Sequence, residues 1–210
     1  MNFKGQLRTL FNEAHKYQYA DISDTPEKVK QKKPSYYFTR VQWALIMLSA
    51  LIALLTKGRF DKDFAGYVVS GLSLFAGLFF SFILMLLDSF QKIDFEPYKK
   101  ENNAKLMPIG VRLKNYYKKA TALSFYIIIL SMISICLLSL SLFNIKIGIS
   151  STPLGDSFMG VLLLWGKSLL AFLYKATTIY FLLDFLWITL YLVTSFYDYV
   201  FSEYDEVKLK

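Results

Sequence analysis

Long apolar blocks separated by charged segments restrict what this sequence can fold into. The blocks run roughly over residues 41–56, 64–87, 121–143 and 158–201. A helix needs about 20 predominantly apolar residues to cross a bilayer. The chain is 55% hydrophobic, whereas a soluble domain is usually about 45–50% apolar. The pattern predicts an all-α polytopic membrane protein with four transmembrane helices and a small helical cytoplasmic region.

The last apolar block is too long for one crossing. At about 1.5 Å per residue it greatly exceeds the ~30 Å hydrocarbon core. No Gly, Pro or Asn near Lys175 marks a turn, so we expect one span over about 176–198 after an interfacial segment over 158–175. The expected division is residues 1–40 (cytoplasmic amphipathic helix and linker), 41–87 (transmembrane helices 1 and 2), 88–120 (cytoplasmic basic segment), 121–201 (transmembrane helices 3 and 4 with the interfacial segment) and 202–210 (cytoplasmic tail).

The orientation follows from the distribution of Lys and Arg. These residues concentrate before the first block and between the second and third, whereas the loop before the last block has only Lys146. Cytoplasmic flanks carry the excess of basic residues. The sequence therefore predicts that both termini are cytoplasmic. Its richness in Lys, Ile, Tyr and Phe is typical of an AT-rich bacterial genome, and we therefore expect the membrane to be a bacterial inner membrane.

One carboxylate, Asp184, stands in the middle of the last block. Ionised and isolated at the bilayer centre, it would cost about 2.5–3.5 kcal/mol. At 100° per residue several polar residues share its face, although Ile188 interrupts them. The stripe has two interpretations: a hydrogen-bonded Asp that joins helices, or the lining of a water-filled path. The candidate pore-lining residues are Thr177, Tyr180, Asp184, Tyr191 and Ser195.

The second block carries a stripe of small residues at spacings of three and four. Small residues let helix backbones approach closely in lipid. The stripe therefore predicts a helix contact, either inside the protomer or between subunits. Its members are Gly66, Ser70, Ser73, Gly77 and Ser81.

Basic and aromatic residues alternate in two other places. The N-terminal "FKGQLRTLFNEAHKYQY" has the spacing of a short amphipathic helix. The segment before the third block contains "YKK" and "YYKK". Such a mixture suits single-stranded nucleic acid, because cations neutralise phosphates and rings stack on bases. It equally suits an anionic leaflet, at about 1 kcal/mol per basic residue.

Signs of catalysis are missing from the sequence. It has one histidine, His15, and no P-loop, dinucleotide-binding, zinc-protease or serine-hydrolase motif. Cys136 is the one cysteine, so an intramolecular disulfide is impossible. We expect a non-enzyme with no cofactor and no metal.

The overall plan is similar to that of small four-span membrane effectors of bacterial anti-phage defence operons. The resemblance rests on the basic amphipathic N-terminus, four spans in 210 residues, and "VRLKNYYKKATALSFYIIIL" leading into the third span. Hailong-type effectors are the first choice and Kiwa membrane subunits the second. The Hailong resemblance implies a homotetrameric channel whose cytoplasmic part binds single-stranded oligodeoxyadenylate from a partner nucleotidyltransferase, and which opens and depolarises the cell when the ligand is lost.

The residues that would contact phosphates and bases follow from charge and aromatic interleaving alone. They are Arg8, Lys99, Lys100, Arg112, Lys114, Tyr116, Tyr117, Lys118 and Lys119. Two other classes stay open: a non-conducting membrane scaffold for a cytoplasmic partner, and a holin-like lesion former. A scaffold needs no polar stripe and a holin needs no aromatic-basic surface. A gated channel uses both features.

Overall fold

All regular structure in the described part of the chain is helical. The computed structural model describes residues 3–20, 32–33, 38–56, 60–98, 107–142 and 158–208. Its elements are α1 (Phe3–Tyr17), α3 (Arg40–Leu55), α4 (Lys62–Gln91), the short 3₁₀ helix η1 (Glu96–Tyr98), α5 (Met107–Leu142) and α6 (Phe158–Lys208). The prediction of an all-α fold is confirmed for these ranges.

Local sequence signals explain where two of these helices begin. Thr39 caps α3: its hydroxyl accepts a hydrogen bond from the Gln42 backbone N–H, and the Gln42 side chain accepts one from the Thr39 N–H. This reciprocal pair satisfies two backbone donors at the helix start. Pro108 stands in the first turn of α5, where a missing N–H costs nothing.

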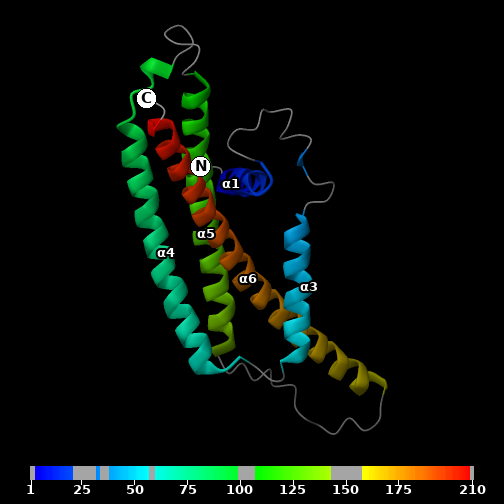
Figure 1. Ribbon diagram of the computed structural model, residues 1–210. Helices are drawn as coiled ribbons and strands as arrows, with labels where there is room; N and C mark the ends of the chain where they lie inside the picture. The colour runs from blue at the N-terminus through cyan, green and yellow to red at the C-terminus, as the bar shows by residue number, and fades with distance from the viewer. Residues whose placement is uncertain are drawn as a thin grey trace.

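The helices are arranged around α5. In Figure 1, α4 and α5 run antiparallel side by side, α6 crosses the bundle diagonally, and α3 lies on the far side of α6. The short helix α1 packs against α5 and lies across the bundle. The end where α4 and α6 finish and α5 starts is called the basic end below, because Lys92, Arg112, Lys114 and Lys118 lie there.

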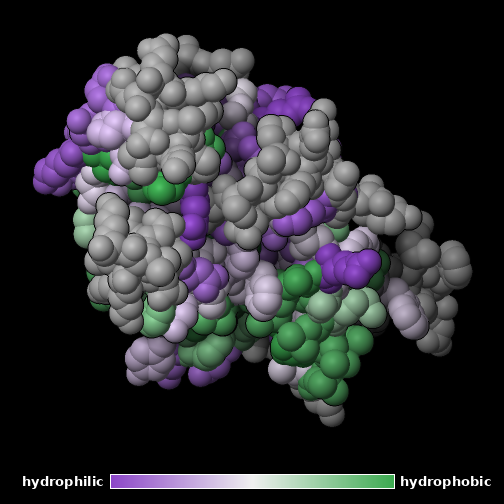
Figure 2. Space-filling model, turned by 45° about the horizontal axis from the view of Figure 1, so that its top comes forward, coloured by the Kyte–Doolittle hydropathy of each residue, from purple (hydrophilic) through white to green (hydrophobic). Residues whose placement is uncertain are grey.

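Burial is concentrated on α5, and large apolar side chains remain outside. Leu123, Ile127 and Leu130 of α5 are completely buried. By contrast, Leu74 on α4 is 64% exposed and Trp165 on α6 is 76% exposed. Figure 2 shows hydrophilic residues gathered toward the basic end and a hydrophobic area on the side of α3 and α6. An apolar exterior of this extent suits contact with lipid.

Three helices are long and apolar enough to cross a membrane. They cover Lys62–Gln91, Ile109–Ser141 and Trp165–Phe201. The predicted first span corresponds to α3, which has 16 residues, or about 24 Å, against a ~30 Å hydrocarbon core. Thr39 caps this helix, which begins at Arg40. The structure thus supports a membrane protein, without confirming a fourth span.

The helix α6 continues through the position where the sequence suggested an interfacial segment. It has 51 residues and no break at Lys175, which agrees with the expectation that no turn lies there. Lys175 Nζ donates a hydrogen bond to the Thr56 carbonyl just after α3, at 2.7 Å. This lysine is thus bound to the end of another helix rather than to Asp184. Whether residues 158–175 are interfacial stays a prediction.

Candidate functional site

A buried carboxyl–tyrosine pair joins the two central helices. Asp184 of α6 is 1% exposed, and Tyr126 of α5 donates its hydroxyl to Asp184 Oδ2 at 3.1 Å. The other oxygen, Oδ1, has no hydrogen-bond partner among the described residues. Leaving a buried acceptor unpaired costs about 1–3 kcal/mol. The carboxylate therefore lies inside the protomer, where it keeps one accepting position unused.

The helix α1 covers the seam between α5 and α6 beside this pair. The ring of Phe11 meets that of Tyr126 edge-on, with centroids 5.6 Å apart. Tyr191 of α6 donates its hydroxyl to the Tyr17 carbonyl at 2.8 Å. Lys119 of α5 places its ammonium 4.7 Å from the centre of the Tyr191 ring. The three helices are therefore linked by polar and aromatic contacts within a few turns of Asp184.

The predicted pore-lining residues do not share one environment. Asp184 and Ser195 are buried, Tyr180 and Tyr191 are half-buried, and Thr177 is exposed. Tyr191 bonds to α1, and Asp184 bonds to α5. Much of the polar stripe therefore faces neighbouring helices of the same protomer. Its role as a pore lining stays a prediction.

The predicted ligand-contact residues also divide by exposure. Arg8, Lys114 and Lys118 are exposed, while Arg112 and Tyr117 are half-buried. Lys99 and Lys100 lie outside the described residues. The remaining two, Tyr116 and Lys119, are each 4% exposed.

The two buried candidates are held by the bundle. The Tyr116 ring stacks on that of Tyr199 of α6, with centroids 3.8 Å apart and planes 12° apart. Lys119 faces Tyr191. Neither side chain is open to an external ligand in this conformation, so a phosphate or base reaches them only if α5 and α6 separate.

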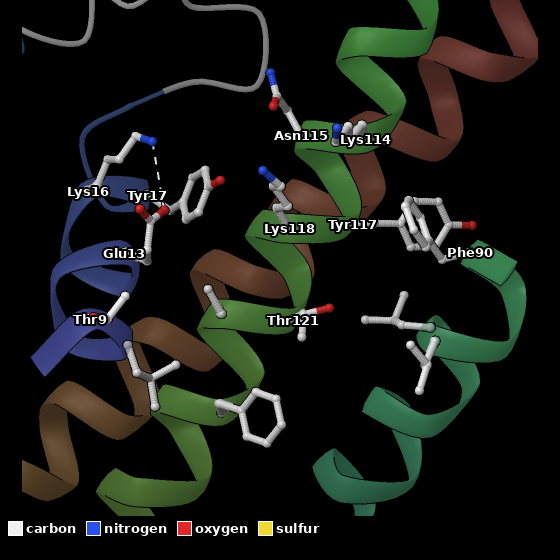
Figure 3. Close-up of a pocket in the computed structure, with 15 residues that line it drawn as sticks. Thr9, Glu13, Lys16, Tyr17, Phe90, Lys114, Asn115, Tyr117, Lys118 and Thr121 are labelled. Atoms are coloured by element: carbon white, nitrogen blue, oxygen red, sulfur yellow. Dashed lines mark ion pairs between the residues drawn. The ribbon is translucent and has the colours of Figure 1, made fainter. Parts of the chain in front are cut away.

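A cavity of about 740 Å³ brings three lysines together with apolar side chains. Its back is α5, and its sides are α1 and the end of α4 (Figure 3). Lys114 and Lys118 belong to the set predicted from sequence, whereas Lys16, Glu13 and Phe90 do not. The lining residues are Thr9, Leu10, Glu13, Lys16, Tyr17, Leu86, Leu87, Phe90, Lys114, Asn115, Tyr117, Lys118, Thr121, Ala122 and Phe125.

The charges in the cavity are only partly balanced. Lys16 Nζ lies 3.7 Å from Glu13 Oε2 on the same helix, as the dashed line in Figure 3 marks. Lys114 and Lys118 have no ion-pair partner within the described ranges. They are four residues apart and thus share a face of α5. Within the described ranges, two cations on one face of α5 therefore have no ion-pair partner.

Burial shifts the titration of two groups on α1. It lowers the pKa of His15 below its usual value of 6.5, and the positive charge of Lys33 acts in the same direction. Burial also raises the pKa of the Tyr17 hydroxyl, with a smaller effect from Glu13. His15 is therefore more readily neutral when α1 is docked on the bundle.

The small-residue stripe of α4 faces away from the protomer. Ser70, Ser73 and Ser81 are exposed and donate their hydroxyls to carbonyls of their own helix. A Cβ added at Gly66 or Gly77 would meet nothing within 4 Å. Of the two interpretations of this stripe, packing inside the protomer is not what the structure has.

Sequence reasoning missed Tyr126, the partner of Asp184. A tyrosine inside an apolar block is a signal, because a buried phenol usually finds a hydrogen-bond partner.

In the parts of the chain that the structure describes, no group of three or more His, Cys, Asp or Glu residues could hold a metal ion.

Comparisons with known proteins give no relative. A scan against protein-family models found no match, and neither did searches of the curated proteins and of the solved structures.

Proposed function

We propose that this protein is a membrane effector that assembles into a conducting homo-oligomer and is gated by an anionic ligand at its basic end. The observation that carries the proposal is the continuity of α5. This helix of 36 residues includes Lys114 and Lys118 near its start and Tyr126, the partner of Asp184, further along. A ligand that pulls on the lysines thus acts through one rigid element on the buried carboxyl.

The described conformation corresponds, in this proposal, to a closed state. The α5–α6 seam is held by the Tyr126–Asp184 hydrogen bond and covered by α1, which Tyr191 holds at Tyr17. Opening would separate α5 from α6 and turn the polar face of α6 toward water. Polar residues inside a membrane bundle commonly mark ion pathways.

Assembly would use the outward face of α4. Its small residues leave the helix backbone uncovered, and such surfaces allow close helix contacts in lipid. Closed cyclic symmetry is the common form of homo-oligomers, and the resemblance to Hailong-type effectors favours a tetramer. The basic end would face the cytoplasm of a bacterium, where basic flanks are expected.

The ligand would be a polyanion such as a single-stranded oligonucleotide. Arg8, Lys114 and Lys118 are exposed and can neutralise phosphates, each with a slope of about −0.7 in log K against log salt. Tyr116 and Lys119 would join the contact only after α5 moves, because α6 covers them in the described state. Ligand binding would then favour seam opening, which is the opposite of the opening by ligand loss that the Hailong resemblance implies.

A flux assay on purified protein in liposomes tests this proposal. The wild type should dissipate a potassium gradient, and the rate of potassium flux should change when an oligodeoxyadenylate is added on the side of the basic end. Asp184→Leu should reduce the flux, because an apolar side chain dries a path. Asp63→Leu is the matched control, since Asp63 is exposed in the first turn of α4, away from the polar face of α6. Flux equal to that of empty liposomes under every condition refutes conduction.

One observation favours a second candidate, a non-conducting membrane scaffold. The hydrogen bonds of Asp184 and Tyr191 lie within the protomer, which is what a structural role requires. The scaffold predicts no flux and tight binding of a protein partner at the basic end. The same liposome assay therefore separates the two candidates.

A further inference from the structure

The cavity between α1, α4 and α5 changes from charged to apolar along its length. Lys114 and Lys118 lie at the basic end, and Ala122 and Phe125 follow on the same helix. The distance from residue 114 to residue 125 along α5 is about 16 Å. The polar groups and the apolar groups are therefore separated along the direction of the spans.

The apolar part of the cavity leaves large side chains uncovered. Phe125 is 38% exposed, and Leu87 of α4 is 53% exposed. Leu86 and Leu10 complete this wall from α4 and α1. A volume of about 740 Å³ falls in the range of cavities that hold small molecules, which are mostly apolar with a few placed polar groups.

The charged part has the sign that a phosphate requires. Lys16 is compensated by Glu13, whereas Lys114 and Lys118 have no carboxylate partner among the described residues. Two ammonium groups on one face of α5 can approach a single phosphodiester from the same side. Figure 3 shows Lys118 reaching into the space between α5 and α1.

We propose that this cavity binds an anionic phospholipid, with its phosphate at Lys114 and Lys118 and an acyl chain against Leu86, Leu87 and Phe125. Basic pockets between membrane helices on the cytoplasmic side bind anionic headgroups. The helices that form the back and one side, α5 and α4, are both long and apolar enough to span a membrane, so the apolar half of the cavity lies where acyl chains are available.

The apolar half of this cavity fits an acyl chain better than it fits the bases of an oligonucleotide. Bases bind single-stranded nucleic acid sites by stacking on aromatic faces, but the Tyr117 ring packs against Phe90, with centroids 5.3 Å apart. Of the two other aromatic lining residues, Tyr17 is buried, and Phe125 shares the apolar wall with Leu86, Leu87 and Ala122. The lipid site does not depend on conduction, so it holds for a channel and for a scaffold alike.

Native mass spectrometry of the full chain in mild detergent tests the lipid site. The probes are phosphatidylglycerol, phosphatidylcholine, inorganic phosphate and a short oligodeoxyadenylate. We expect phosphatidylglycerol to bind more tightly than phosphatidylcholine and to resist displacement by excess inorganic phosphate. The double variant Lys114→Ala/Lys118→Ala should bind it about 30-fold more weakly, which corresponds to about 1 kcal/mol per lysine.

Matched controls separate charge from folding and acyl contact from charge. Lys62→Ala removes an exposed lysine from the opposite end of α4 and should leave binding unchanged. Leu87→Asn should weaken phospholipid binding while leaving any phosphate adduct unchanged. Leu74→Asn, which lies outside the cavity, should leave phospholipid binding unchanged.

Three results would overturn the proposal. One is equal affinity for phosphatidylglycerol and phosphatidylcholine. Another is unchanged phospholipid binding by the double lysine variant in protein of wild-type mass and helicity. The third is phospholipid binding that Leu87→Asn leaves unchanged, because no acyl chain would then lie against the apolar wall of the cavity.

Discussion

Removing the hydroxyl of Tyr126 should weaken the contact between α5 and α6. Tyr126→Phe deletes the donor that lies 3.1 Å from Asp184 Oδ2. Because Oδ1 has no partner among the described residues, the variant leaves both carboxyl oxygens unpaired. Hydrogen bonds between membrane helices contribute about 0.6 kcal/mol on average and about 1.7 kcal/mol at most. This bond is completely buried, so we expect its contribution in the upper half of that range.

A double-mutant cycle isolates this contribution. The free energy of unfolding is measured in mixed micelles with increasing dodecyl sulfate for the wild type, Tyr126→Phe, Asp184→Leu and the double variant. Each single change should lower stability. The double variant should lose less than the sum, with an interaction energy of about 1–1.7 kcal/mol.

A second cycle serves as the control. It pairs Tyr126→Phe with Thr194→Val, because Thr194 is exposed and bonds to a carbonyl of its own helix. These two changes should add within about 0.3–0.5 kcal/mol. An interaction energy between Tyr126 and Asp184 no larger than this control value would refute the reasoning, since the carboxyl would then not hold the seam.

Three further predictions concern other parts of the chain. Gly110→Ala should destabilise the start of α5 by about 1–3 kcal/mol, because the new Cβ would lie 2.5 Å from Tyr98 Cβ. Gly166→Ala, which has open space around the new Cβ, should cause no such loss. Thermal unfolding in detergent measures the stability of both variants. Acidification should loosen α1, because docking lowers the pKa of His15. The undocked state takes up the proton first, so the docked state becomes less stable as the pH drops below about 6.5. Hydrogen exchange of α1 should therefore rise in the wild type but not in His15→Gln. Gly77→Ile should reduce the oligomer mass without unfolding the protomer, because a Cβ at this position would meet nothing within 4 Å among the described residues. Unchanged oligomer mass would exclude this face of α4 as the interface.

The sequence predicted the helices well because apolar periodicity and capping act locally. The second, third and last apolar blocks became α4, α5 and α6. The polar stripe around Asp184 was also visible, since it depends only on helical spacing. The first block, residues 41–56, nearly coincides with α3, whose start is set by the capping box at Thr39.

The surroundings of the stripe could not be predicted, because they depend on which helices meet. Asp184 pairs with Tyr126, which lies 58 residues away in the chain. Tyr116 and Tyr117 are neighbours in sequence, yet one stacks inside the bundle on Tyr199 and the other packs against Phe90 at the edge of a cavity. Charge and aromatic interleaving cannot separate two such residues. Only the crossing of α6 over α5 does so.

The contribution of Lys16 to the cavity was equally hidden. The amphipathic pattern of the N-terminal segment predicts a helix with an apolar face but not the surface on which that face docks. In the structure Phe11 meets Tyr126 and Tyr17 accepts from Tyr191, which places α1 on the α5–α6 seam. The remaining polar face of α1 then brings Lys16 and Glu13 to the cavity.

Single-channel recording of the purified protein in a planar bilayer tests the proposed conduction most directly. The account predicts discrete current steps that change in open probability when an anionic ligand is added on the side of the basic end. Asp184→Asn keeps the side-chain volume and removes the carboxylate, so it should alter the step size or the ion selectivity, whereas Asp63→Asn on α4 should not. A silent bilayer containing protein of confirmed oligomeric mass would contradict the account, and so would identical currents from the wild type, Asp184→Asn and Asp184→Leu.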